Sequence, residues 1–302
     1  MKMSLHAGWV GSIAVLLLSM SLHFSQLLDF TSMFSQLFII TTPVDSSPFS
    51  KVASIQYSAL TEDSLTVDSP ILHSMSKFGF FYVSDVPDYS ALKELELLKR
   101  FFSLPLPVKM ELAVNKHDGR NRNVYRGYGP LVEDSGTQYK ELFNIGPHED
   151  PTPAFSPTDT PLDKLRAVSR EQNVWPHTGD NEFDQEFRRV FQEGLRMRQR
   201  IARGVIRSIG RSLGAEDLIN RFTESEFSTL GLRKYPVRTR ELVRMNSEYD
   251  GVTLSELEHE DSTVTILATF NYTGLQALYE DKYYEVPPSG SNSFIVNIGT
   301  LI

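Results

Sequence analysis

The apolar positions of the chain follow a helical period in several stretches before residue 214 and a strand-like period after Ser228. Between residues 181 and 213, apolar side chains recur every three or four positions, which predicts one long amphipathic helix. The same period predicts a helix over 92–102. Residues 71–86 predict a helix that passes through Gly79 into a strand at 80–83. An αβ region therefore precedes the long helix.

The other segments predict short strands and loops. Residues 54–60 predict a strand, and the proline-rich segment 147–180 predicts mostly loop. The arginines between 188 and 211 are expected on the solvated face of the long helix. After Ser228 the pattern predicts the strands of an antiparallel sandwich or barrel, in the segments TLGLRKYP, TVTILATF, GLQALYE, YYEVPP and SFIVNIG. The fold class that this order indicates is α+β.

The N-terminal segment has a different composition from the rest. Residues 8–22 carry no charged side chain and follow Lys2, a pattern typical of a signal-peptide core or a short anchor. The stretch is short for a spanning helix, which needs about 20 apolar residues. The alternative is an extension without function. We treat residues 1–50 as an apolar N-terminal extension and expect the folded part to begin near Lys51.

Composition narrows the chemistry that the chain could carry. Its 302 residues have a formal net charge of -8, which argues against a nucleic-acid-binding protein, whose binding face needs clustered lysine and arginine. Cysteine is absent, so disulfides, zinc-thiolate sites and thiol catalysis are excluded. Any metal ion must then be held by histidine, aspartate, glutamate or water.

One tripeptide, His259-Glu260-Asp261, lies at the start of an apolar, β-branched run. If residues 257–267 form a strand, His259 and Asp261 point to the same side. With a distant histidine, such a pair makes the 2-His-1-carboxylate site of Fe(II) oxygenases. His148-Glu149-Asp150 has the same letters but precedes a proline-rich segment, so we expect a surface loop there. A metal hydrolase is a further alternative, although the HExxH pattern is absent because residue 263 is threonine.

The order of several motifs between residues 54 and 299 resembles the isopenicillin N synthase-like family of Fe(II)/2-oxoglutarate-dependent dioxygenases. In the N-terminal half, the matching motifs are SIQYSAL, FGFFYV, FFSLPLPVKM, YRGYGP, YKELFNIG and NVWP. In the C-terminal half, they are LRKYP, HED, GLQALYE and YYEVPPSGSNSFIVNIG. Each motif is weak by itself, and the signal is their shared order and spacing.

This resemblance implies a double-stranded β-helix (jelly-roll) core with an N-terminal αβ region and a long central helix. It implies that His259 and Asp261 are ligands of Fe(II), and that Tyr235 of LRKYP contacts the carboxylate of 2-oxoglutarate or of the substrate. The reaction implied is the hydroxylation or desaturation of a small organic substrate by molecular oxygen. Residues 51–180 would be the N-terminal dioxygenase region and 181–302 the long helix with the core. The family implies a cytoplasmic location, and residues 8–22 are the only segment suited to a membrane.

The sequence departs from the family after the VNIG strand. The family's second iron histidine and its Arg-x-Ser co-substrate motif lie beyond that strand, whereas no histidine follows His259 here. We therefore expect the core to lack its last strands and the chain to be an incomplete copy of an oxidoreductase. The alternative is a non-catalytic relative that acts as a binding or interaction module. No catalytic residue is assigned from the sequence.

Overall fold

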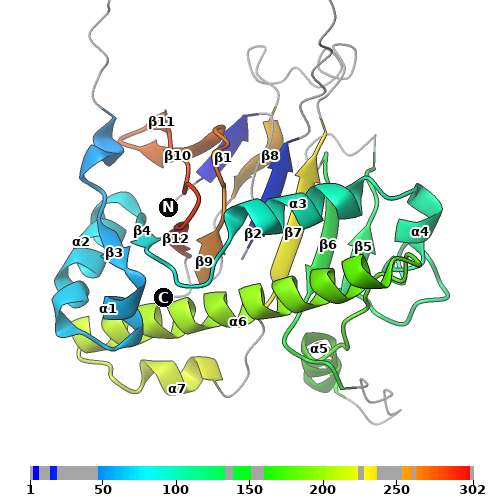
Figure 1. Ribbon diagram of the computed structural model, residues 1–302. Helices are drawn as coiled ribbons and strands as arrows, with labels where there is room; N and C mark the ends of the chain where they lie inside the picture. Colours follow the sequence, from blue (N-terminus) through cyan, green and yellow to red (C-terminus); the bar gives the residue numbers. More distant parts are fainter. Residues whose placement is uncertain are drawn as a thin grey trace, which may run out of the picture.

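The computed structural model describes residues 3–6, 14–18, 47–132, 139–150, 160–223, 228–236, 254–259, 261 and 263–299. Figure 1 shows one long helix running beside the strands, with shorter helices at both ends. The helices are α1 Tyr57–Thr61, α2 Asp68–Phe78, α3 Ala91–Phe102, α4 Leu106–Met110, α5 Pro161–Ser169, α6 Asn181–Ser212 and α7 Leu218–Thr223. The 3-10 turns η1 and η2 span Pro48–Lys51 and Leu65–Val67.

The strands form three sheets of four strands each, within the described part of the chain. The sheet orders are β11-β10-β1-β8, β3-β4-β12-β9 and β2-β7-β6-β5. Most neighbours are antiparallel, and the β2–β7 and β3–β4 pairs are parallel. The bounds are β1 Met3–His6, β2 Ala14–Leu18, β3 Ser54–Gln56, β4 Phe80–Ser84, β5 Gly127–Gly129, β6 Glu141–Ile145, β7 Leu230–Tyr235, β8 Leu254–His259, β9 Val264–Leu267, β10 Leu275–Tyr279, β11 Lys282–Glu285 and β12 Phe294–Ile298.

Helix α6 begins and ends close to the predicted positions. The side chain of Asp180 caps its N-terminus by accepting a hydrogen bond from the backbone N–H of Phe183. Two acidic residues in the first turn, Glu182 and Asp184, suit the positive end of the helix dipole. Gly214 follows the last turn with a φ of +66°, a conformation that glycine adopts without strain. The long helix predicted over 181–213 is confirmed.

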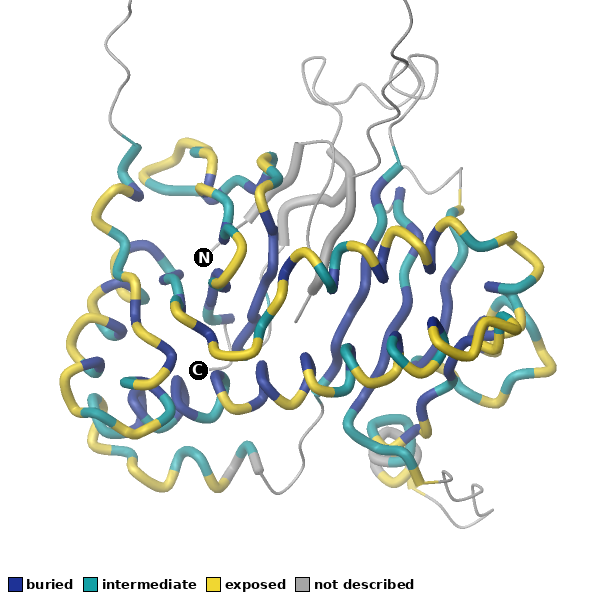
Figure 2. The backbone as a smooth tube through the Cα atoms, viewed as in Figure 1, coloured by how far each residue is buried: buried dark blue, intermediate teal, exposed yellow. Residues whose placement is uncertain are grey.

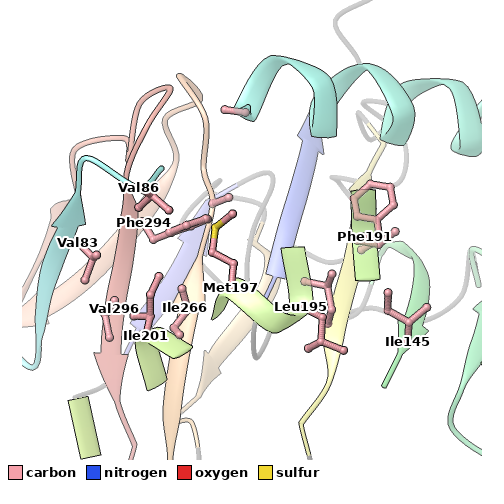
Figure 3. Close-up of a cluster of buried hydrophobic side chains, with 14 of the residues drawn as sticks. Val83, Val86, Ile145, Phe191, Leu195, Met197, Ile201, Ile266, Phe294 and Val296 are labelled. Carbon is pink, nitrogen blue, oxygen red and sulfur yellow. The ribbon is translucent and has the colours of Figure 1, made fainter. Parts of the chain in front are cut away.

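The larger apolar core lies between α6 and the strands, and it defines two faces of the sheets. We call the face turned toward α6 the helix-covered face and the opposite one the far face. Figure 3 shows Leu195, Met197 and Ile201 of α6 packed among side chains of the strands, such as Phe294 and Val296 of β12. In Figure 2 the strands behind α6 are mostly buried, whereas the outer side of the helix is largely exposed. Burial of this one apolar stripe holds α6 against the sheets.

Several predicted elements are confirmed, including the helix-to-strand turn at Gly79. Gly79 ends α2 with a φ of +79°, and its N–H donates to the carbonyls of Ser74 and Met75. Residue 80 then begins β4, as predicted. Helix α3 corresponds to the prediction over 92–102, and each of the five C-terminal segments contains a strand, β7 and β9 to β12.

One prediction about local structure is wrong, and another is incomplete. The segment 54–60 is a strand only as far as Gln56, because the chain turns into α1 at Tyr57 and packs Tyr57 and Leu60 into the core. The segment 147–180 contains α5 in addition to loop. Thr160 and Asp163 form a capping box at its start, and Pro161 occupies the first helical position, where its missing N–H costs nothing.

The N-terminal segment contributes to two of the sheets. Strand β1 lies between β10 and β8, and β2 pairs in parallel with β7. Backbone pairing of residues 3–6 and 14–18 extends both sheets, and the domain boundary near Lys51 stays a prediction. Signal or anchor function for residues 8–22 stays a prediction. No helix in the described ranges is long and apolar enough to cross a membrane.

One arginine of α6 is inside the protein, contrary to the prediction that these arginines are solvated. Arg198 is fully buried and donates from Nη1 and Nη2 to the carboxylate of Glu94 on α3, at 2.9 and 2.8 Å. Its guanidinium also lies over the ring of Phe294 in β12, 4.5 Å from the centroid. Burial opposes the charge, but Glu94 outweighs it and raises the pKa of Arg198. The pair connects α3, α6 and β12.

Loss of one partner of this pair should destabilise the protein strongly. We expect Glu94→Gln to lower the free energy of unfolding by roughly 3 to 5 kcal/mol, because Arg198 would keep a buried charge without a counter-charge. The double variant Glu94→Leu with Arg198→Met should recover much of the loss, since it removes both charges. Urea denaturation measures both effects. Glu96→Gln on the exposed side of α3 is the control, and a loss below about 1 kcal/mol for Glu94→Gln would contradict the expectation.

Candidate functional site

The far faces of β7 and β12 carry Tyr235, which is a candidate site residue, and Asn297. Along β7, Leu230 and Leu232 point into the core beneath α6, so the alternation of side chains places Arg233 and Tyr235 on the far face. Along β12, Phe294 and Val296 join the same core, whereas Ile295 belongs to a second apolar cluster. Asn297 follows Ile295 on that side of the strand.

Tyr235 lies in the second apolar cluster and is 1% exposed. The buried members of this cluster come from η1, the end of α2, several strands and the residue after β11: Phe49, Phe78, Phe80, Tyr235, Leu267, Leu275, Ala277, Val286 and Ile295. Because β7, β9, β10 and β12 all contribute, side chains of these strands meet in one interior region. The predicted contact of Tyr235 with a carboxylate stays a prediction.

His259 and Asp261 do not lie on one continuous strand. Strand β8 ends at His259 and pairs with β1, whereas β9 begins at Val264 and pairs with β12 of another sheet. Asp261 lies between the two strands, where the chain leaves one sheet and enters the next. The prediction of a single strand over 257–267 is therefore wrong. The alternation of side chains along one strand therefore cannot explain how His259 and Asp261 would bind the same metal ion.

The carboxylate of Asp261 is oriented by a side chain from β12. Asn297 donates from Nδ2 to Oδ2 of Asp261 at 2.8 Å, and Asn297 is itself buried. Asp261 is half-buried. A hydrogen bond of this kind fixes the direction of a metal-binding carboxylate. In the sequence, Asn297 was recognised only as part of the VNIG motif. Its contact with Asp261 depends on the pairing of β12 with β9.

The described residues supply some, but not all, of the ligands that an iron site needs. Imidazole and carboxylate are ligands that Fe(II) accepts, and His259 and Asp261 are two such residues in adjacent positions of the fold. Within the described ranges, no three histidine, aspartate or glutamate side chains lie close enough together to hold a metal ion. The described part of the chain thus offers a pair of candidate ligands, and no third ligand is assigned.

The second tripeptide, His148-Glu149-Asp150, is more than a surface loop. The carboxylate of Glu149 accepts hydrogen bonds from Asn173 Nδ2 at 2.7 Å, Trp175 Nε1 at 3.2 Å and Arg188 Nη2 at 2.9 Å. It thereby ties the loop to the segment before α6 and to α6 itself. These three donors connect the Glu149 carboxylate to neighbouring parts of the fold, so Glu149 has a structural role.

Sequence reasoning missed a buried charge network on the helix-covered face. Glu141 of β6 accepts from Lys109 Nζ at 2.5 Å, from Lys234 Nζ at 2.8 Å and from the hydroxyl of Tyr128 at 2.6 Å. Burial would raise the pKa of Glu141, but these three hydrogen bonds outweigh it and lower the pKa. Burial and the charge of Glu141 raise the pKa of Tyr128. Both oxygens of the Glu141 carboxylate therefore have protein partners, and the network connects α4, β5, β6 and β7.

Comparisons with known proteins identify a related family model and similar solved structures. Residues 52–178 match the family model described as "non-haem dioxygenase in morphine synthesis N-terminal". This match lies in the part of the chain that the sequence resemblance assigns to the N-terminal region of Fe(II)/2-oxoglutarate-dependent dioxygenases. The resemblance inferred from the sequence is therefore confirmed. No curated protein matches the chain in a sequence search.

Solved structures show the same fold. A full-length protein of Neurospora crassa in complex with alpha-KG is similar with a TM-score of 0.61 and 21% identity, over 82% of this chain and 73% of that chain. The C-terminal truncated form of that Neurospora crassa protein, in apo form, gives a TM-score of 0.58 and 21% identity, over 83% and 82%. A 2OG-Fe(II) oxygenase family protein of Caulobacter crescentus gives 0.57 and 20% identity, over 84% and 74%.

The hydrogen bond between Asn297 and Asp261 should affect metal binding. We expect Asn297→Leu to weaken binding of Mn(II), a redox-stable substitute for Fe(II), by roughly 10- to 100-fold, because the carboxylate loses its orienting donor. Isothermal titration calorimetry on the full chain measures the affinity. Asn115→Leu removes an exposed amide far along the chain and is the control. An unchanged Mn(II) affinity in a folded Asn297→Leu variant would exclude the orienting role.

Proposed function

We propose that the chain is an Fe(II) and 2-oxoglutarate-dependent oxygenase that oxidises a small organic substrate with molecular oxygen. The observation that carries the proposal is the position of Asp261, held by Asn297 immediately after the strand that ends at His259, in a fold shared with 2OG-Fe(II) oxygenases. The N-terminal family match supports the same function. The Neurospora crassa protein, with alpha-KG in its solved complex, supports 2-oxoglutarate as co-substrate.

We further propose that the strands around Tyr235 form a double-stranded β-helix. Its support is the second apolar cluster, in which strands of all three sheets contribute side chains to one interior region. Residues 51–180 would form the N-terminal dioxygenase region, and 181–302 would form the long helix and this core. Helix α6 would then pack on the outside of this β-helix, because it covers the opposite faces of β7, β9 and β12.

In this proposal each candidate residue has one task. His259 and Asp261 would hold Fe(II), and Asn297 would keep the Asp261 carboxylate in position. The metal with its co-substrate would supply the activation of oxygen. Tyr235 would contact a carboxylate from the far face of β7, where its burial excludes water from the contact. The small size of the ligands in the Neurospora crassa complexes, alpha-KG and 5-formyluracil, supports a small-molecule substrate.

Oxygen consumption tests the proposed function. We expect oxygen uptake to require both Fe(II) and 2-oxoglutarate, to stop with EDTA and to return when Fe(II) is added. His259→Ala should reduce the rate at least about 100-fold, because a lost ligand costs more than a lost orienting group. His148→Ala, in the second His-Glu-Asp tripeptide, is the matched control and should keep the rate.

Two results would contradict the oxygenase proposal. One is oxygen uptake that is independent of Fe(II) in the wild-type chain. The other is equal loss of uptake in His259→Ala and His148→Ala, which would mean that the first tripeptide has no special role. Ligand binding by the wild-type chain without any Fe(II)-dependent uptake would favour the binding-module alternative.

A further inference from the structure

The far face of β7 carries a buried arginine two residues before Tyr235. Arg233 is 6% exposed, and alternation along the strand places it on the same face as Tyr235, away from α6. Its neighbour Lys234 points the opposite way and binds Glu141 on the helix-covered face. The side chains of the two adjacent basic residues of LRKYP therefore lie on opposite faces of the sheet.

Arg233 uses only part of its hydrogen-bonding capacity. Its Nη1 donates to Asn144 Oδ1 at 2.8 Å and to the carbonyl of Leu232 at 3.2 Å. Its Nε is buried and has no hydrogen-bond partner among the described residues. No carboxylate in the described ranges lies within ion-pair distance of it, whereas fully buried Arg198 is paired with Glu94. A buried guanidinium without an anion is energetically costly, so its retention needs a reason.

The guanidinium is held in a fixed place by its surroundings. Asn144 is directly opposite Gly231 in the β6–β7 pairing, and its Nδ2 donates to the carbonyl of Tyr125 at 3.3 Å, which turns Oδ1 toward Arg233. A Cβ added at Gly231 would lie 2.6 Å from Nη2 of Arg233, so the guanidinium rests against the glycine backbone. The orientation is thus set before any ligand arrives, which reduces the entropy cost of binding.

We propose that Arg233 is the anchor of a carboxylate-binding subsite, in which Nε and Nη2 take the two oxygens of a small organic acid. Both observed hydrogen bonds leave from Nη1, so the Nε–Nη2 edge is the one left for a fork-shaped contact with a carboxylate. Asn144 is the positioning residue. The proposal rests on the proposed function, and the carboxylate comes either from 2-oxoglutarate or from the substrate.

Ligand binding to the full chain tests this subsite. Calorimetric titrations use two probes, 2-oxoglutarate and, separately, the monocarboxylates benzoate and hexanoate, each with and without Mn(II). We expect Arg233→Met to weaken binding of one probe class roughly 10- to 100-fold, the effect of losing a charge-assisted bidentate contact. Arg233→Lys should recover only part of the affinity, because an ammonium group cannot form the fork.

Lys234→Gln is the matched control, because it removes a positive charge from the next residue of the same strand on the other face. It should leave the affinity for every probe unchanged. Urea denaturation separates binding from folding. Arg233→Met should be at least as stable as the wild-type chain, because it removes an uncompensated buried charge, whereas a purely structural arginine would leave a destabilised variant.

The outcomes distinguish the sources of the carboxylate. Loss of 2-oxoglutarate binding alone assigns the subsite to the co-substrate, and loss of monocarboxylate binding alone assigns it to a substrate acid. Unchanged binding of both classes in Arg233→Met, or no binding of either by the wild-type chain, would overturn the proposal. Because these titrations do not require turnover, failure of the oxygen-consumption test leaves their result interpretable.

Discussion

The structure depends on the burial of one face of its strands beneath α6. Side chains alternate along each strand, so a strand whose one face packs on α6 must present its other residues to the far side. In β7 this rule sends Leu232 toward the helix and Arg233 away from it. In β12 it sends Val296 toward the helix and Asn297 away. The packing of a single helix thereby sorts residues that are neighbours in sequence into structural and candidate functional sets.

Buried charges follow the same division. On the helix-covered side, charge is balanced: Glu94 pairs with Arg198, and Glu141 is shared between Lys109 and Lys234. These pairs connect helices to strands and leave little for a ligand to bind. On the far side, Asp261 is held by a neutral amide and Arg233 has no ion-pair partner among the described residues. The buried guanidinium of Arg233 therefore lies where an organic acid could supply the balancing charge.

The strongest sequence predictions were those with long or repeated signals. The long helix predicted over 181–213 forms as expected. Its apolar spacing continues for roughly nine turns, at about 3.6 residues per turn, so one unfavourable residue does not change the prediction. Short signals were less reliable. The strand predicted at 54–60 gives way to α1 because Tyr57 and Leu60 reach the core as helical residues, and α5 forms inside a proline-rich segment because its proline is at the first helical position.

The amino-acid sequence alone predicted the long helix, the C-terminal strands, the resemblance to the dioxygenases and the candidate residues His259, Asp261 and Tyr235. These features are read from local periods and from motif order, and both are properties of neighbouring residues. Only the tertiary structure placed Asn297 against Asp261, Asn144 against Arg233 and Glu94 against Arg198. Such pairs join residues far apart in the chain, and strand register and helix packing decide them after the local elements have formed.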